Sequence, residues 1–192
     1  MNRIDIMVDL ETLGKSAETP LIQFSAIAFD ITNGRVLDRF DNKIRLDGHI
    51  LVDADTLKWW LKTNVELLNQ IIAEGVFTEQ ETLENFKTFV EYQTFTESLK
   101  LKNVYLWGNG ILFDNTIIKG KMLKYDMVYP IFYRNDRDVR TFAEAACLIT
   151  GDTYENMREE AHKNFLEHDA LQDCLAQIEL ICRAYQIIKP TT

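Results

Sequence analysis

The chain has 192 residues and a formal net charge of −9, with 46% hydrophobic and 27% charged residues. This composition excludes a disordered or fibrous protein, and the length predicts one domain over residues 1–192. No apolar run approaches the roughly 18 to 20 residues that span a bilayer, and residues 1–5 lack the apolar stretch of a signal peptide. We therefore expect a cytoplasmic protein without membrane contact.

The acidic charge also limits the possible partners. Proteins that hold long duplexes do so by neutralising phosphates with a broad basic surface, which this composition argues against. Short or single-stranded nucleic acids remain allowed. The three cysteines form no C-x-x-C pair, so we expect buried thiols rather than a zinc or redox site.

The first part of the chain predicts a three-stranded antiparallel meander. An apolar run at residues 4–11 predicts the first strand, and a polar connection follows it up to residue 20. Residues 21–30 predict a buried strand, and Thr32-Asn33-Gly34 predicts a hairpin turn. Residues 35–46 predict a half-solvated return strand with a possible bulge.

A helix is expected next, from residue 56 to about residue 75, with Asp53 or Asp55 as its N-cap. Trp59 and Trp60 are neighbours and cannot share one helical face, so we expect one in the core and one near the surface. An exposed Trp can stack on a base, as single-strand binders do. The alternative, that both tryptophans cover core edges, stays open.

The rest of the chain alternates helices and strands. A capping box at residues 78–81 begins a helix that buries one apolar face. The further expected elements are a polar linker at 93–102, a buried strand at 104–107, a helix after residue 114, a strand at 128–133, a charged turn at 134–138, a helix at 139–149, a polar mobile segment at 152–163 and a long helix up to residue 185. This alternation is typical of an α/β fold with helices on both faces of a mixed sheet.

Carboxylates occur where two of these strands end. Asp9 and Glu11 are two positions apart, so in a strand their side chains lie on the same face. Two anions a few Å apart raise each other's pKa unless a cation lies between them, which indicates a metal site. Asp114 follows the end of a later strand, where ligands bind in open α/β sheets. The alternatives are a solvated strand end for the pair and an N-cap for Asp114.

His168 and Asp173 are five positions apart, which on a helix is a difference of about 140°. They converge only if His168 precedes the helix, with Asp169 as the N-cap and Asp173 inside. That arrangement gives one fixed ligand and one movable base. His49 and His162 have no comparable context.

Three blocks follow one another in a familiar order, namely Asp9-Leu10-Glu11-Thr12, Asn109 to Asp114 and His168 to Asp173. With them the chain resembles the DEDDh branch of the DEDD superfamily of 3′-5′ exonucleases, which includes the proofreading exonuclease subunit, oligoribonuclease and ribonuclease T. Within it the chain is similar to the ribonuclease-T-like group related to phage exonuclease A. That likeness rests on Asp55 to Trp60, Trp107 to Gly110, Phe113 to Asn115 and Arg137 to Thr141, and it covers about residues 4–185.

The resemblance implies a ribonuclease-H-like fold, with an antiparallel meander in a mixed sheet flanked by helices. It implies that Asp9, Glu11, Asp114 and Asp173 hold two Mg²⁺ or Mn²⁺ ions and that His168 is the general base. The reaction would release nucleoside 5′-monophosphates from the 3′ ends of single-stranded DNA or RNA. Relatives often dimerise, so a homodimer is a further expectation.

The resemblance also indicates substrate contacts within or beside the blocks, at Thr12, Leu13, Asn109, Phe113 and Asn115. Leu13, Phe24 and Phe113 are candidates to stack on the terminal base, and each is also a candidate core residue. Asn109 and Asn115 either contact the scissile phosphate or complete the turn. Two other functions stay open. One is a phosphodiesterase for dinucleotides or short oligoribonucleotides, and the other is a non-catalytic nucleic-acid-binding module.

Overall fold

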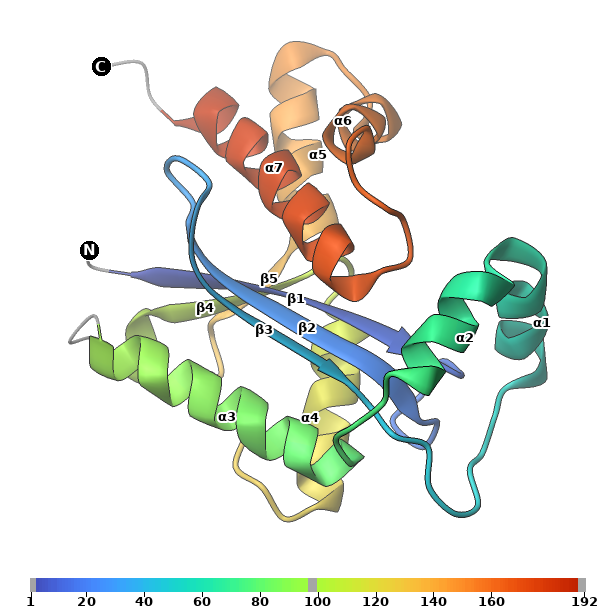
Figure 1. Ribbon diagram of the computed structural model, residues 1–192. Helices are drawn as coiled ribbons and strands as arrows, with labels where there is room; N and C mark the ends of the chain where they lie inside the picture. The colour runs from blue at the N-terminus through green and yellow to red at the C-terminus, as the bar shows by residue number, and fades with distance from the viewer. Residues whose placement is uncertain (1–2, 97–99, 190–192) are drawn as a thin grey trace.

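The computed structural model describes residues 3–96 and 100–189. A five-stranded sheet with the order β3-β2-β1-β4-β5 forms its centre (Figure 1). The strands are β1 (Ile4–Thr12), β2 (Leu21–Asp30), β3 (Arg35–Lys43), β4 (Val104–Gly108) and β5 (Asp136–Asp138). The first three pair antiparallel, whereas β4 and β5 pair parallel on the other side of β1. The predicted meander and mixed sheet are therefore confirmed.

The β2–β3 hairpin closes as expected. Gly34 adopts a φ of 73°, a left-handed conformation that glycine takes without steric cost. Ala28 pairs with Asp38 and Phe29 pairs with Val36, so Leu37 is an extra residue in β3. This is the bulge that the sequence indicated.

Helices cover both faces of the sheet (Figure 1). The helices are α1 (Ala54–Thr63), α2 (Val65–Ala73), α3 (Glu79–Thr96), α4 (Asp114–Lys124), α5 (Val139–Thr150), α6 (Tyr154–His162) and α7 (Ala170–Ile188). In the view of Figure 1, α3 and α4 lie below the sheet and α5, α6 and α7 above it, while α1 and α2 lie near the carboxyl end of β1. None of the helices in the described ranges is long and apolar enough to cross a bilayer.

The alternation of β1 separates two apolar layers. Ile6 and Val8 pack into the core below the sheet, together with Phe86 of α3. Met7 packs into the core above it, together with Ile178 and Ile181 of α7. Since side chains two apart share a face, the odd-numbered positions after Met7 also point toward α7.

The single helix predicted from residue 56 to residue 75 is wrong, because it breaks at Asn64. The backbone of Asn64 is extended, with a φ of −156°, and its side chain accepts from the N–H of Leu67 at 3.1 Å. Asn64 thus ends α1 and caps α2, a role for which asparagine is well suited. Asp53 is the N-cap of α1, accepting from the N–H of Thr56.

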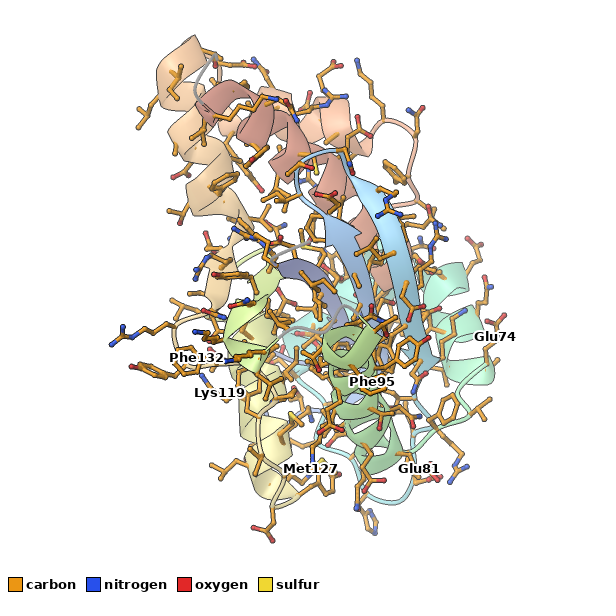
Figure 2. All side chains as sticks on the ribbon, turned by 90° about the vertical axis from the view of Figure 1, so that its left-hand side faces the viewer. Glu74, Glu81, Phe95, Lys119, Met127 and Phe132 are labelled. Carbon is orange, nitrogen blue, oxygen red and sulfur yellow. The ribbon has the colours of Figure 1, made fainter. Side chains whose placement is uncertain are left out.

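Two other expectations are corrected. Residues 128–133 form no strand, and the predicted charged turn contains β5 instead. Ile131 and the half-buried Tyr129 do pack against the core, but β4 pairs only with residues 136–138. Phe132 points outward in Figure 2. Residues 128–133 therefore form a loop that packs on the core.

The segment at 152–163, expected to be polar and mobile, contains α6. Thr153 caps this helix by accepting from the N–H of Asn156 at 3.2 Å. Met157 and Ala161 are buried against the core above the sheet. Two buried apolar residues within a charged segment are too weak a sequence pattern to predict a helix.

Candidate active site

The carboxyl ends of β1 and β4 bring three carboxylates together. Asp9 and Glu11 pair with Ser25 and Gln23 of β2 and are on the same face of the sheet. Asp114 begins α4 only six residues after β4, which is the parallel neighbour of β1. Asp114 lies in the first turn of α4 and is not its N-cap, a position taken by Phe113.

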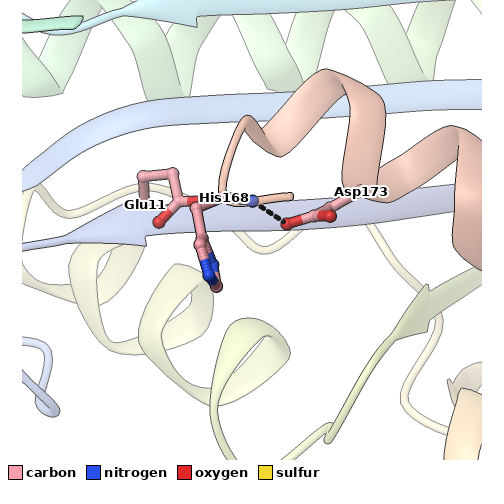
Figure 3. A group of neighbouring side chains, drawn as sticks. All are labelled: Glu11, His168 and Asp173. Atoms are coloured by element: carbon pink, nitrogen blue, oxygen red, sulfur yellow. Dashed lines mark hydrogen bonds between the residues drawn. The ribbon is translucent and has the colours of Figure 1, made fainter. Parts of the chain in front are cut away.

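The start of α7 contributes two further groups. Asp169 is the N-cap, accepting from the N–H of Gln172 at 3.0 Å, so Asp173 lies inside the first turns. His168 has a φ of 69° and donates its backbone N–H to Asp173 Oδ2 at 3.0 Å (Figure 3). The left-handed conformation turns the chain back on itself and brings the His168 side chain to the carboxylate five residues later.

Burial raises the pKa of each carboxyl group in this cluster, and repulsion between the acids raises those of Asp9 and Glu11 further. Glu11 and Asp114 are only 8% and 4% exposed. Burial, followed by the charges of Asp114, Glu11 and Asp173, raises the pKa of Asp9 well above its usual range. The pKa of Glu11 rises for the same reasons. Burial is also the largest cause that raises the pKa of Asp114 to about 7 and that of Asp173 to about 6.

The residues fit a divalent cation. Ligand atoms of Glu11, His168 and Asp173 lie within 4.8 Å of one another (Figure 3). The set is dominated by carboxylate oxygens, the hard ligands that Mg²⁺ and Mn²⁺ prefer. A cation would also relieve the repulsion that raises the pKa values of Asp9 and Glu11.

Two neighbours of the cluster were not predicted. Gln177 is 2% exposed, and its Nε2 donates to Asp9 Oδ1 at 2.8 Å. It lies one helical turn after Asp173, and this i, i+4 spacing is the signal that could have identified it. His162 is 8% exposed, and its Nε2 lies 3.9 Å from Asp173 Oδ1. Burial lowers the pKa of His162, which favours a neutral ring.

Gln177→Leu is expected to weaken cation binding about tenfold, because the amide holds one oxygen of Asp9 and leaves the other free. Isothermal titration of the protein with Mn²⁺ measures the change. Gln172→Leu on the same helix serves as the control. Equal affinities for parent and Gln177→Leu would contradict a positioning role.

A cavity of about 470 Å³ adjoins the cluster. Its lining includes Glu11, Trp59 and Phe113. The Trp59 side chain is 41% exposed, and its ring lies edge-on to His168 with 4.8 Å between centroids. Trp60 is 1% exposed, and its Nε1 donates to Thr12 O at 3.0 Å. One tryptophan is thus in the core and the other faces the cavity, as predicted.

Some predicted substrate contacts lie elsewhere. Leu13 and Phe24 are only 3% and 0% exposed and pack in core clusters, so neither has a free face for a base. Leu10 lines the cavity instead of Leu13. Asn115 is also buried, and its Nδ2 donates to Asp136 Oδ1 at 2.8 Å, which ties α4 to β5. The predictions for Leu13 and Asn115 are therefore corrected.

Thr12, Phe113 and Asn109 line cavities at the site. Thr12 and Phe113 line the cavity of about 470 Å³, although Thr12 is only 6% exposed. Its Oγ1 donates to Gly14 O at 2.5 Å, which fixes the chain after β1. Asn109 Oδ1 accepts from Arg140 Nε at 3.3 Å and from the Tyr154 hydroxyl at 3.2 Å.

Solved structures share this fold. The nuclease domain of 3′hExo, a DEDDh family member bound to rAMP, aligns with a TM-score of 0.64 at 13% identity, over 96% of this chain and 92% of that one. Cell-death related nuclease 4 (CRN-4) aligns with a TM-score of 0.70 at 16% identity, over 97% of this chain and 65% of that one. The zinc-bound complex of E. coli exonuclease I with single-stranded DNA aligns with a TM-score of 0.63 at 16% identity, over 98% of this chain and 41% of that one.

Sequence comparison gives the family. The exodeoxyribonuclease of Enterobacteria phage T4 is 25% identical over 198 residues, which cover 91% of this chain and 86% of the phage protein. The family defined by the 3′-5′ exoribonuclease Rv2179c-like domain matches residues 4–184. The fold, the phage relative and this match agree with the predicted 3′-5′ exonuclease. The chain belongs to the family of the 3′-5′ exoribonuclease Rv2179c-like domain.

Proposed function

We propose that this exonuclease uses two divalent cations, held by Asp9, Glu11, Asp114 and Asp173, to hydrolyse the 3′-terminal phosphodiester bond of single strands. The observation that carries the proposal is the convergence of four carboxylates with raised pKa values at one end of the sheet. A buried cluster of four acids is costly without cations to balance it. When bound, such ions lower the pKa of a water molecule and stabilise the charge that develops on the leaving oxygen.

His168 acts as the general base in this proposal. Burial lowers the pKa of its imidazole, so the ring is neutral and able to accept a proton at neutral pH. The hydrogen bond from its backbone N–H to Asp173 fixes the start of the side chain. The edge contact with Trp59 limits the rotation of the ring. A ring nitrogen of His168 lies within 4.8 Å of carboxylate oxygens of Glu11 and Asp173.

The cavity lined by Trp59 and Phe113 takes the 3′-terminal nucleoside. It adjoins Glu11, so a nucleoside seated there places its 5′ phosphate next to the carboxylates. The exposed face of Trp59 offers a stacking surface for the base. Support comes from 3′hExo, whose structure contains rAMP, a nucleoside monophosphate of the kind this reaction releases.

Digestion of single-stranded DNA and RNA oligomers labelled at the 5′ end tests the proposal. We expect a ladder of shortening products with Mg²⁺ or Mn²⁺ and no cleavage with chelator. Absence of shortening by a folded protein supplied with either ion would refute the activity. Cleavage confined to dinucleotides would instead indicate a phosphodiesterase for small substrates.

The sugar preference is the second result of this digestion. The matched family is named for an exoribonuclease and the phage T4 relative for an exodeoxyribonuclease, so we propose that both sugars are accepted. Discrimination depends on how the site treats one 2′-hydroxyl. The proposed homodimer is measured separately, by light scattering of the purified protein.

Trp59→Ala is expected to raise the KM for single strands about tenfold, because stacking on an aromatic ring contributes about 1–3 kcal/mol per base. Steady-state kinetics on a labelled oligomer measure the change. Leu61→Ala, at a 55% exposed position of the same helix, is the matched control. An unchanged KM in Trp59→Ala would exclude the stacking role.

A further inference from the structure

A second cavity lies on the other side of Phe113. It has a volume of about 720 Å³. Its lining includes Leu112, Phe113 and Arg140, together with the acids Asp138 and Glu144. Phe113 lines both this cavity and the one that also contains Trp59, so the two adjoin at this ring. The proposed mechanism does not use this second cavity.

Arg140 is held at the edge of the second cavity by neutral groups. Its Nε donates to Asn109 Oδ1 at 3.3 Å, and the Tyr154 hydroxyl donates to the same oxygen at 3.2 Å. The guanidinium lies over Gly110, where an added Cβ would be 3.7 Å from Nη1. Gly110 also has a φ of 119°, a conformation that only glycine adopts readily.

Within the described ranges, the guanidinium of Arg140 forms no salt bridge. No carboxylate oxygen in the part of the chain that the structure describes lies within 4.0 Å of the guanidinium, although its charge acts on the carboxyl groups of Asp114 and Asp138 and the Tyr154 hydroxyl lies beside it. The nearby Asp138 is already engaged, accepting from the N–H groups of Thr141 and Ile111 at 2.8 and 3.1 Å. Arg140 therefore presents a planar, charged guanidinium at the second cavity without a salt-bridge partner.

The surroundings indicate what this guanidinium binds. The chain has a net charge of −9, yet this arginine beside the acidic cluster lacks a direct carboxylate partner. A guanidinium matches the geometry of a phosphate with two parallel hydrogen bonds. Consider a nucleic-acid strand whose terminal nucleoside lies on one side of Phe113 and whose scissile phosphate lies at the carboxylates. Its next nucleoside then extends toward the second cavity.

We propose that Arg140 binds the phosphate on the 5′ side of the penultimate nucleoside and that the second cavity takes this nucleoside. The inference rests on the proposed function, because it needs the 3′ end in the cavity lined by Trp59. It adds a subsite that recognises the strand beyond the bond being cleaved. The matching substrate is a dinucleotide with a 5′ phosphate or any longer strand.

Three small substrates separate this phosphate from the scissile one. A dinucleoside monophosphate with a free 5′ hydroxyl has only the scissile phosphate, whereas its 5′-phosphorylated form and a trinucleotide also have the next one. In Arg140→Gln we expect KM to rise about tenfold more for the last two substrates than for the first. Any change on the first substrate reports the loss of the Arg140 charge, which acts on the carboxyl group of Asp114. Arg140→Lys keeps the charge but not the planar guanidinium, so it should recover only part of the affinity.

Arg35→Gln is the matched control. It removes an exposed arginine at the β2–β3 turn, at the end of these strands that lies away from the carboxylates. An equal loss on all three substrates would place Arg140 at the scissile phosphate and overturn the proposal. So would unchanged kinetics on all three.

Binding without catalysis gives an independent measurement. With chelator present, the fluorescence anisotropy of a labelled single-stranded octamer reports its affinity at several salt concentrations. The slope of log K against log salt should be less steep in Arg140→Gln by about 0.7, the value for one phosphate contact on a single strand. An unchanged slope would overturn the proposal. If the parent binds the octamer but cleaves nothing, the proposed function fails while the Arg140 contact is still tested.

Discussion

Replacing Asp114 with asparagine is expected to abolish exonuclease activity and, in the metal-free protein, to raise the melting temperature. The first effect follows because an amide cannot supply the anionic ligand that the proposed mechanism requires. The second follows because Asp114 is 4% exposed beside other acids, and burial raises its pKa to about 7. Asparagine has nearly the same shape without the charge, so it removes the repulsion and keeps the packing.

The stabilisation depends on pH in a predictable direction. An unfolded Asp has a pKa of about 3.9, so between that value and about 7 the folded chain holds a proton that the unfolded chain has lost. Stability from this group is fully present below the lower value and is lost as the pH rises through the upper one. Three pKa units at about 1.4 kcal/mol each amount to about 4 kcal/mol, so we expect Asp114→Asn to melt roughly 10 °C higher than the parent at pH 8, with a smaller gap at pH 5.

Thermal melting in chelator at both pH values, followed by addition of Mn²⁺, measures these differences. Glu159→Gln is the control, because it neutralises an exposed acid on α6. The cation should stabilise the parent and the control but not Asp114→Asn. An equal or lower melting temperature for Asp114→Asn at pH 8 would contradict the view that the cluster stores repulsion. Retained exonuclease activity would remove Asp114 from the mechanism.

Most residues of the candidate site can be predicted from the sequence, because their relative positions depend on local backbone geometry. Period-two alternation places Asp9 and Glu11 on one face, and the N-cap Asp169 places Asp173 one turn into α7. These relations depend on neighbouring residues only. That both groups then meet Asp114 depends on the parallel pairing of β1 with β4, which the family blocks imply and periodicity alone does not.

Other features depend on contacts between distant segments. Arg140 is exposed and polar, and its hydrogen bond to Asn109 joins positions that are far apart in the sequence. Conversely, the position of Leu13 beside the first block indicated a substrate contact, whereas the structure places Leu13 in a core cluster with Trp60. The sequence did not predict the break at Asn64, because apolar periodicity continues through it. A single side chain, that of Asn64, caps the second helix there.

His168→Asn is expected to lower kcat by about 10²- to 10⁴-fold, the usual contribution of a general base, while leaving cation affinity within about threefold. Burial lowers the pKa of His168, so the parent should lose activity only as the pH falls below the usual histidine range near 6.5. Protonation removes the base, so any acid limb that remains in His168→Asn should come from the carboxyl groups of Asp114 and Asp173, whose pKa values are raised to about 7 and about 6. Kinetics between pH 5 and 8 and titration with Mn²⁺ measure the two properties.

The titration distinguishes a general base from a metal ligand. The geometry allows both roles, since a His168 ring nitrogen lies within 4.8 Å of oxygens of Glu11 and Asp173. A base that is not a ligand leaves cation affinity nearly unchanged when it is replaced, whereas loss of a ligand weakens it by one or more orders of magnitude. His49→Asn, at an exposed position outside the site, controls for the removal of a histidine. A large loss of Mn²⁺ affinity in His168→Asn would make His168 a ligand. The proton would then have to pass to another group, of which the buried His162, 3.9 Å from Asp173, is the next candidate.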